Sequence, residues 1–288
     1  MLPVSLALNA QGRFGDVRRW NDEVGPLAER VGNTGGIMQH RRTTTLADFY
    51  ASGDLDLLDA LGTADRDLCE SAGFRWVSSS WTWLGLARFL RGDWVEALPL
   101  FEEAARLEPP GTLSGWNASL LFECLAYRGD KAEALAVLND RQLPPSGQPK
   151  SWGAAVLLLV VVEGLTVLGE RDRAAALYPS VVDVFERTGA LCPHHDDGRL
   201  YERAAGIAAL AGRRWDAAQQ HFRTALRQAA DFHHRPEEAH TRGWYGRMLL
   251  ERASPGDRPH AEKVLRQAAA DYERMGMPRH RVLAARMV

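Results

Sequence analysis

The sequence predicts an all-α fold, an α-solenoid of about six to seven helical hairpins in a right-handed superhelix. A short glycine-containing phrase recurs along the 288 residues, and the segments between its copies have helical rather than alternating apolar periodicity. In such a stack each hairpin buries its apolar face against its neighbours. We therefore expect a single helical-repeat domain over residues 1–288, with weaker repeats over residues 1–75 and clearer ones over residues 76–288.

The recurring phrase consists of the end of an apolar helix, a glycine, an acidic or polar residue and, shortly after, an alanine. Copies occupy residues 90–98, 127–135, 168–174, 211–218 and 254–261, with weaker ones at residues 12–14 and 52–55. The copies are roughly 40 residues apart, slightly more than the tetratricopeptide period of about 34. Glycine can adopt the left-handed conformation that ends a helix, and the next acid can cap the following helix. Each copy therefore predicts a corner between two helices.

The clearest unit, residues 78–109, resembles a tetratricopeptide repeat. Its matching residues are Trp81, Leu84 and Gly85 on the first helix, Ala97, Phe101 and Ala104 on the second, and Pro109 as the stop. Arg88 stands where that pattern has an aromatic residue. A small alanine lets two helices approach, and a large residue four positions later fills the space beyond. The residues in that later position are Phe101, Leu138, Phe222 and Leu265. Core positions are also expected for Trp81, Trp94 and Trp215.

Helix breaks are expected where proline and glycine are dense, at residues 143–149, 189–198 and 252–259. Residues 160–162 are three valines, which suit a strand. Their flanks have helical character, so we expect a helix there as well.

Composition narrows the functional classes. Basic residues number 35 and acidic residues 37, so the net charge of −2 predicts no direct nucleic-acid or membrane partner. The longest apolar run, residues 154–162, is far shorter than the about 20 residues of a membrane span. Three widely spaced cysteines and an N-terminus without a signal-peptide pattern indicate a cytoplasmic protein.

No motif points to catalysis. Residues 192–197 gather metal-capable side chains in one loop, but adjacent residues rarely converge on one ion and no second cluster accompanies them. Residues 32–36 have the glycines of a phosphate-binding loop without its Lys and Ser/Thr, and no G-x-S-x-G phrase occurs. We expect no catalytic residue, no cofactor and no metal, while a site built from scattered residues stays an alternative.

Six residues are candidates for a partner-binding groove on the inner surface. They are Trp116, Trp152, Arg199, Arg203, Arg242 and Arg247. The two tryptophans lie near the start of first helices, where a side chain faces either the core or the groove. The arginines predict a positive stripe for an acidic peptide or a phosphate-bearing ligand. The alternative is a solvated face neutralised by Glu202, Glu237 and Glu238.

Several longer phrases carry a family resemblance. They lie at residues 162–171, 174–179, 204–209, 215–226, 248–252 and 272–280. From about residue 116 onward the chain resembles the C-terminal tetratricopeptide-repeat region of bacterial class III adenylate/guanylate cyclase and AAA-ATPase-type multidomain signalling proteins. The resemblance covers most of the chain and is looser before residue 75. The resemblance implies a regulatory tail without the cyclase aspartate pair or the ATPase phosphate loop.

These observations favour a non-catalytic scaffold for protein–protein interaction or regulation in bacterial signalling. The expected partner is a protein or peptide, with a cyclase or ATPase domain among the candidates. Two alternatives remain: a sensory or autoinhibitory tail of a nucleotide cyclase or ATPase, and a regulator that senses a small ligand.

Overall fold

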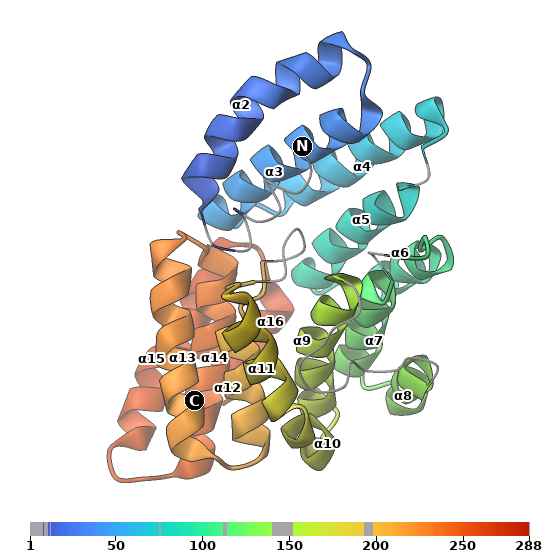
Figure 1. The fold of residues 1–288 in the computed structure, drawn as a ribbon. Helices are drawn as coiled ribbons and strands as arrows, with labels where there is room; N and C mark the ends of the chain where they lie inside the picture. The colour runs from blue at the N-terminus through green and yellow to red at the C-terminus, as the bar shows by residue number, and fades with distance from the viewer. Residues whose placement is uncertain are drawn as a thin grey trace.

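The computed structural model describes residues 8, 11, 13–74, 76–111, 114–139, 152–192 and 198–287, and all regular secondary structure in them is helical. This confirms the predicted all-α class. The helices are α2 (Phe14–Arg30), α3 (Thr34–Ser52), α4 (Asp56–Ala72), α5 (Val77–Arg91), α6 (Trp94–Arg106), α7 (Trp116–Arg128), α8 (Lys131–Asn139), α9 (Trp152–Val167), α10 (Arg171–Ala176), α11 (Tyr178–Thr188), α12 (Tyr201–Ala211), α13 (Trp215–Asp231), α14 (Arg235–Arg252), α15 (Asp257–Arg274) and α16 (Pro278–Ala285). Figure 1 shows their order along the fold.

Helices that follow one another in sequence pack as pairs, among them α5 with α6, α12 with α13 and α14 with α15. The predicted corners lie between the members of such pairs. Gly92 and Gly129 end α5 and α7 with left-handed φ angles of 88° and 90°. Asp93 precedes α6, but its side chain makes no capping hydrogen bond, so that part of the expectation was wrong.

The corner between α12 and α13 lies one residue later than predicted. Gly212 has a φ of −84°, and Arg213 adopts the left-handed conformation with a φ of 55°. Counted back from the tryptophan that begins the second helix, Arg213 occupies the place of Gly92, because two positions separate each from Trp215 or Trp94. The residue that adopts the left-handed conformation is thus set by its distance from the start of the second helix and not by the presence of a glycine.

In the α5–α6 and α12–α13 pairs, a glycine on the first helix faces a large side chain on the second. A Cβ atom built on Gly85 would lie 2.7 Å from the ring of Phe101, and one on Gly206 would lie 2.7 Å from the ring of Phe222. Both rings are fully buried, which confirms their predicted core role. Close approach of the two helices therefore depends on the absence of a side chain at these glycines.

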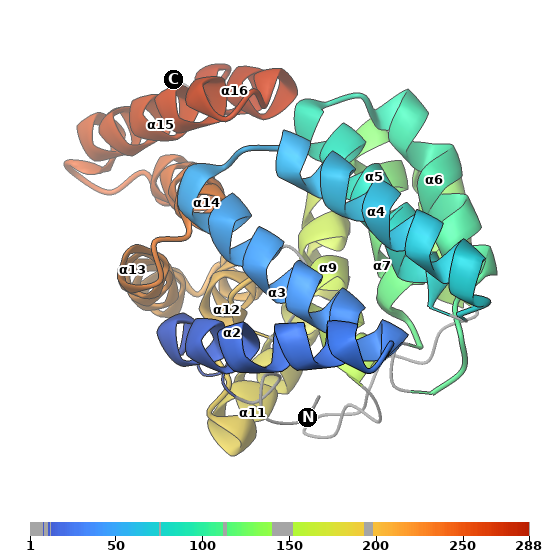
Figure 2. The ribbon, with the colours of Figure 1, turned by 90° about the horizontal axis from the view of Figure 1, so that it is seen from above.

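Helices from the early and late parts of the series contact one another. Helix α14 packs against α3, and α16 packs against α5, as Figure 2 shows from above. At this seam, the guanidinium of Arg279 lies 4.7 Å from the ring centroid of Trp94, and Met277 is fully buried. In an open repeat stack each unit contacts only its neighbours. Here the pairs form a closed ring instead.

The structure tests several predictions about single residues. Trp94 is buried as predicted, but Trp81 and Trp215 are only half-buried, and Trp83 is the fully buried tryptophan of α5. Arg88 stands at the position of the expected aromatic residue. Its guanidinium donates hydrogen bonds to both oxygens of Asp59 on α4, at 2.8 and 2.7 Å.

The expected breaks lie partly outside the described residues. Residues 160–162 lie within α9 and are fully buried, so tertiary packing favours the helix there. The break predicted at residues 252–259 is shorter, since α14 ends at Arg252 and α15 begins at Asp257. The break at 143–149 and the metal-capable residues 193–197 lie outside the described residues. None of the described helices is both long and apolar enough to span a membrane.

Two glycines of α14 test the packing argument with matched helix propensity. A Cβ on Gly246 would lie 2.5 Å from Leu265, whereas one on Gly243 would lie 3.5 Å from the Tyr272 hydroxyl, an ordinary contact. Both changes to alanine gain the same helix propensity. We expect Gly246→Ala to be less stable than Gly243→Ala by about 1–3 kcal/mol, because only the first overpacks the core. Urea unfolding measures the difference, and equal stabilities would contradict close packing at Gly246.

Candidate functional site

A cluster of charged residues lies buried on the inner side of the ring. It is carried by α7, α9, α12 and α14, the first helices of successive pairs. Glu163 stands at its centre on α9, a helix packed between α7 and α12, and is only 3% exposed. We call the residues Glu123, Glu163, Arg199, Arg203 and Glu237 the buried ion cluster.

Glu163 receives hydrogen bonds from four side chains. Arg199 and Arg203 donate to its Oε2 atom, the former at 3.1 Å. The Tyr127 hydroxyl donates to Oε1 at 2.8 Å, and the Trp244 indole nitrogen donates to the same atom at 3.2 Å. One carboxylate thus connects α7, α12 and α14 to α9.

The two arginines also bind further carboxylates. Arg199 donates to both oxygens of Glu123, at 2.8 and 3.1 Å. Arg203 donates to Glu237 at 2.7 Å, and the backbone amide of Glu237 donates to Nδ1 of His234 at 3.2 Å. The pairing satisfies charges that would otherwise be costly to bury.

Electrostatics keep this cluster ionised. Burial alone would raise the pKa of Glu163, but the charges of Arg203 and Arg199 outweigh it and hold that pKa well below its usual range. Burial alone would lower the pKa of Arg203, yet Glu163 and Glu237 raise it above its usual value. The ion pairs therefore persist at any physiological pH.

The structure places the four arginines proposed for a groove in different environments. Arg199, which directly precedes α12, and Arg203 are both buried in the ion cluster. Arg242 pairs with Glu238 and Asp271 at the half-exposed edge of α14. Arg247 lines a pocket that is described below.

The two candidate tryptophans begin helices as expected. The Trp116 side chain, at the start of α7, is buried, and its ring centroid lies 5.6 Å from that of Trp83. It belongs to the core and is not offered to a partner. Trp152 is the first residue of α9, and its side chain lies outside the described part of the structure.

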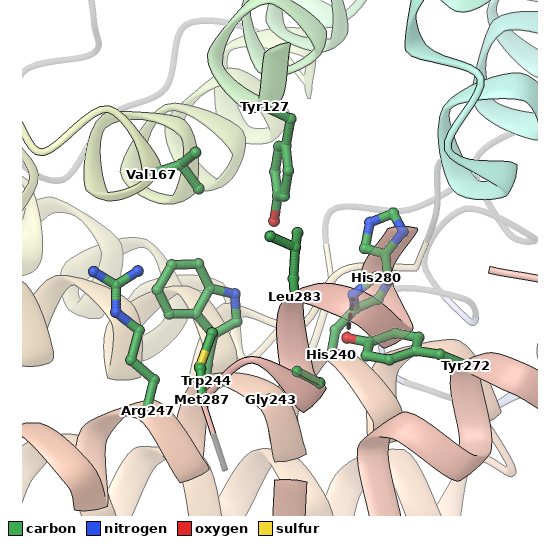
Figure 3. Close-up of a pocket in the computed structure, with 11 residues that line it drawn as sticks. Tyr127, Val167, His240, Gly243, Trp244, Arg247, Tyr272, His280, Leu283 and Met287 are labelled. Carbon is green, nitrogen blue, oxygen red and sulfur yellow. Dashed lines mark hydrogen bonds between the residues drawn. The ribbon is translucent and has the colours of Figure 1, made fainter. Parts of the chain in front are cut away.

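A pocket of about 240 Å³ lies beside the ion cluster, between α7, α9, α14, α15 and α16. Figure 3 shows Trp244 and Arg247 on one side of it and His240, Tyr272 and His280 on the other. The complete lining is Tyr127, Val167, His240, Gly243, Trp244, Arg247, Tyr272, His280, Leu283, Ala284 and Met287. Its walls are mainly aromatic and apolar, and Arg247 is the one arginine among them.

Most polar atoms of the pocket wall already have partners. Tyr127 and Trp244 donate to Glu163, and the Tyr272 hydroxyl lies 3.0 Å from Nδ1 of His240. His280 is 4% exposed, and its Nδ1 atom has no hydrogen-bond partner in the described part of the chain. The pocket consequently presents ring faces and few free hydrogen-bonding groups.

Both imidazoles of the pocket are neutral. Burial lowers the pKa of His280 to about 4, opposed by Glu163 and a hydrogen bond to the Leu90 backbone. Burial, followed by the neighbouring His280 and Arg203, also holds the pKa of His240 well below its usual value. Neutral aromatic walls suit an apolar ring better than a hydrated ion.

Sequence reasoning missed Glu123, Glu163, Trp244 and His280. For Glu163 a signal existed: this acid directly follows the apolar run of residues 154–162, which the structure buries almost completely. An acid that continues a buried helix without a loop requires cationic partners.

The described part of the chain gives no support for a metal site or a reactive thiol. No group of three His, Cys, Asp or Glu residues is placed there to hold a metal ion. Cys69, Cys124 and Cys192 are buried and unpaired with one another, and burial raises the pKa of the Cys124 thiol to about 12. Comparison with protein-family models found no match, and neither did comparison with curated proteins.

The ion cluster predicts a strong effect of one charge. Glu163→Gln should lower stability by about 3–5 kcal/mol, because it leaves Arg203 and Arg199 buried without their shared carboxylate. Glu103→Gln is the control, since Glu103 pairs only with the exposed Arg106 one turn away on α6. Thermal and urea unfolding compare the two variants. Similar midpoints for both would show that the buried pairs do not hold the ring together.

The neutral His280 predicts acid sensitivity. Below pH 6.5 the unfolded chain takes up a proton at this residue, whereas the folded chain does so only near pH 4. The unfolded state therefore binds more protons in this interval, and stability falls as pH drops. From pH 7 to pH 5 the loss from this residue is roughly 1–2 kcal/mol.

Unfolding curves measured across that range check the effect. His280→Gln should flatten the pH dependence, because glutamine does not titrate. His260→Gln, the same change at an exposed histidine, is the matched control. An unchanged slope in His280→Gln would contradict a neutral buried imidazole.

Proposed function

We propose that this chain is a non-catalytic helical-repeat module that regulates a signalling process by binding a small molecule in the pocket beside the ion cluster. The observation that carries the proposal is the division of the inner face. The buried ion cluster fills its centre, and a preformed cavity of about 240 Å³ remains at its edge.

The size of the cavity supports a small ligand. Pockets for drug-sized molecules usually measure about 300–1,000 Å³. An apolar cavity of about 150 Å³ holds benzene. The present cavity therefore suits a molecule of one or two rings, much smaller than a folded partner or an extended peptide.

The interpretation of the fold as a helical repeat is part of the same proposal. Paired helices with glycine corners support a tetratricopeptide-like solenoid, and the resemblance to repeat tails of cyclase and ATPase signalling proteins supports a regulatory role. In this proposal the ligand acts through a protein partner, such as a cyclase or ATPase domain, that contacts the outside of the ring.

A general peptide-binding scaffold is less well supported. Arg199 and Arg203 would have contributed half of the four arginines in its positive stripe, and both are bound to buried carboxylates. A peptide could reach them only by breaking those ion pairs, at a cost of several kcal/mol. A partner that avoids the inner face remains compatible with the fold.

Native purification tests the proposal. Protein taken from the cell that produces it, then unfolded, should release a small molecule in near-equal molar amount, detected by mass spectrometry. Gly243→Leu should carry far less, because a leucine at this pocket-lining position occupies the cavity. Gly243→Ala, which adds only a methyl group 3.5 Å from Tyr272, is the matched control and should retain the molecule.

Equal recovery from the leucine variant and the wild type would place the molecule elsewhere. Absence of any bound molecule from the wild type would contradict small-ligand binding and favour the scaffold interpretation.

A further inference from the structure

We propose that the ligand of this pocket is a planar aromatic molecule with one carboxylate group, held by its ring between the aromatic walls and by its charge at Arg247. This inference rests on the function proposed above and specifies the chemical class of the ligand.

The walls select a flat ring. Tyr127, Trp244 and Tyr272 line the cavity, and the polar atoms of all three are engaged with Glu163 or His240. What remains for a ligand is therefore ring surface, apart from the part of the Trp244 ring that the Arg247 guanidinium covers. Aromatic pairs gain from offset-stacked or edge-to-face contacts, so an aromatic ligand gains more here than an aliphatic one of equal size.

Arg247 supplies the charged end. Its Nε atom donates to Glu251 at 2.9 Å, and its guanidinium lies 5.1 Å from the ring centroid of Trp244. Its two terminal nitrogens have no hydrogen bond within the described ranges. Two parallel N–H donors on a planar group match the geometry of a carboxylate.

Arg247 shares its carboxylate partner with a second arginine. Glu251 is shared between Arg247 and Arg171, whose Nη1 atom lies 2.7 Å from it. Each of the two guanidiniums therefore has only part of this carboxylate, and the guanidinium of Arg247 can still attract an anionic ligand. Arg247 is also half-exposed, which makes it reachable from solvent.

Glu163 determines the direction of the ligand. Its carboxylate accepts hydrogen bonds from Tyr127 and Trp244 and acts electrostatically on His240 and His280, on the side of the pocket opposite Arg247. A negative group placed there would be repelled in a region of low dielectric, whereas at Arg247 it is attracted. The carboxylate of the ligand thus points to Arg247 and its ring points inward, toward neutral His240 and His280.

An aromatic cation is the main competing class. Aromatic rings with a carboxylate behind them also attract quaternary ammonium groups. Here, however, the Arg247 guanidinium already lies over the Trp244 ring. The protein supplies its own cation at the position that such a ligand would need.

Three probes of one ring and different charge separate the classes. Benzoate, benzamide and benzyltrimethylammonium are titrated into the full chain, with binding followed by ligand-observed NMR. We expect benzoate to bind about tenfold more tightly than benzamide, the difference made by one charge-assisted arginine contact. Benzyltrimethylammonium should bind more weakly than either.

Two variants assign the contact. Arg247→Gln should weaken benzoate about tenfold and leave benzamide nearly unchanged, because only the anion uses the guanidinium. Arg258→Gln is the matched control: Arg258 forms the same kind of one-turn ion pair, with Glu262 on α15, and does not line the pocket. Unfolding midpoints verify that both variants are folded.

The outcomes also separate this inference from the proposed function. If benzamide or the cation binds as tightly as benzoate, or if Arg247→Gln leaves benzoate unaffected, the carboxylate class is wrong. If the probe that binds in that case loses its binding in Gly243→Leu, the pocket is still a ligand site. If none of the probes binds, the aromatic carboxylate is likewise excluded, and the molecule released from native protein decides the function of the pocket.

Discussion

A carboxylate buried in a protein interior stays ionised only when cations and hydrogen-bond donors surround it, and Glu163 imposes this condition on the inner face. Its four donors come from α7, the segment before α12, α12 itself and α14. These elements are distant in sequence, so their common requirement is a constraint on the ring that local helix pairing does not supply. Because unpaired buried charges are so costly, few alternative arrangements of the inner helices remain.

That constraint also explains the character of the inner surface. In an open stack of helical pairs the concave face is free to bind an extended partner. Here the first helices direct carboxylates and guanidiniums toward one another, and the seam between α16 and α5 completes the enclosure. Among the described residues, a small aromatic pocket lies beside the charged side chains. The pocket proposed for a ligand is thus the space that the ion cluster leaves unfilled.

Local features of the fold were predictable from the sequence, and long-range ones were not. Gly92, Phe101 and Phe222 could be assigned because corners and pair packing depend on residues close in the chain. The corner at Arg213 was misplaced by one residue because glycine alone was taken as its mark. The contact of Glu163 with Trp244 joins residues 81 positions apart, and no periodicity encodes such a pairing.

The seam between α16 and α5 has a consequence for how the molecule comes apart. Linear arrays of helical pairs fray from their termini, since a terminal unit has only one neighbour. In this ring the α14–α16 segment has neighbours on two sides, α13 before it and α3 and α5 across the seam. Its backbone amides should exchange with deuterium as slowly as those of the middle helices. Fluctuations then start at α2, which lies outside the closure and packs on α3.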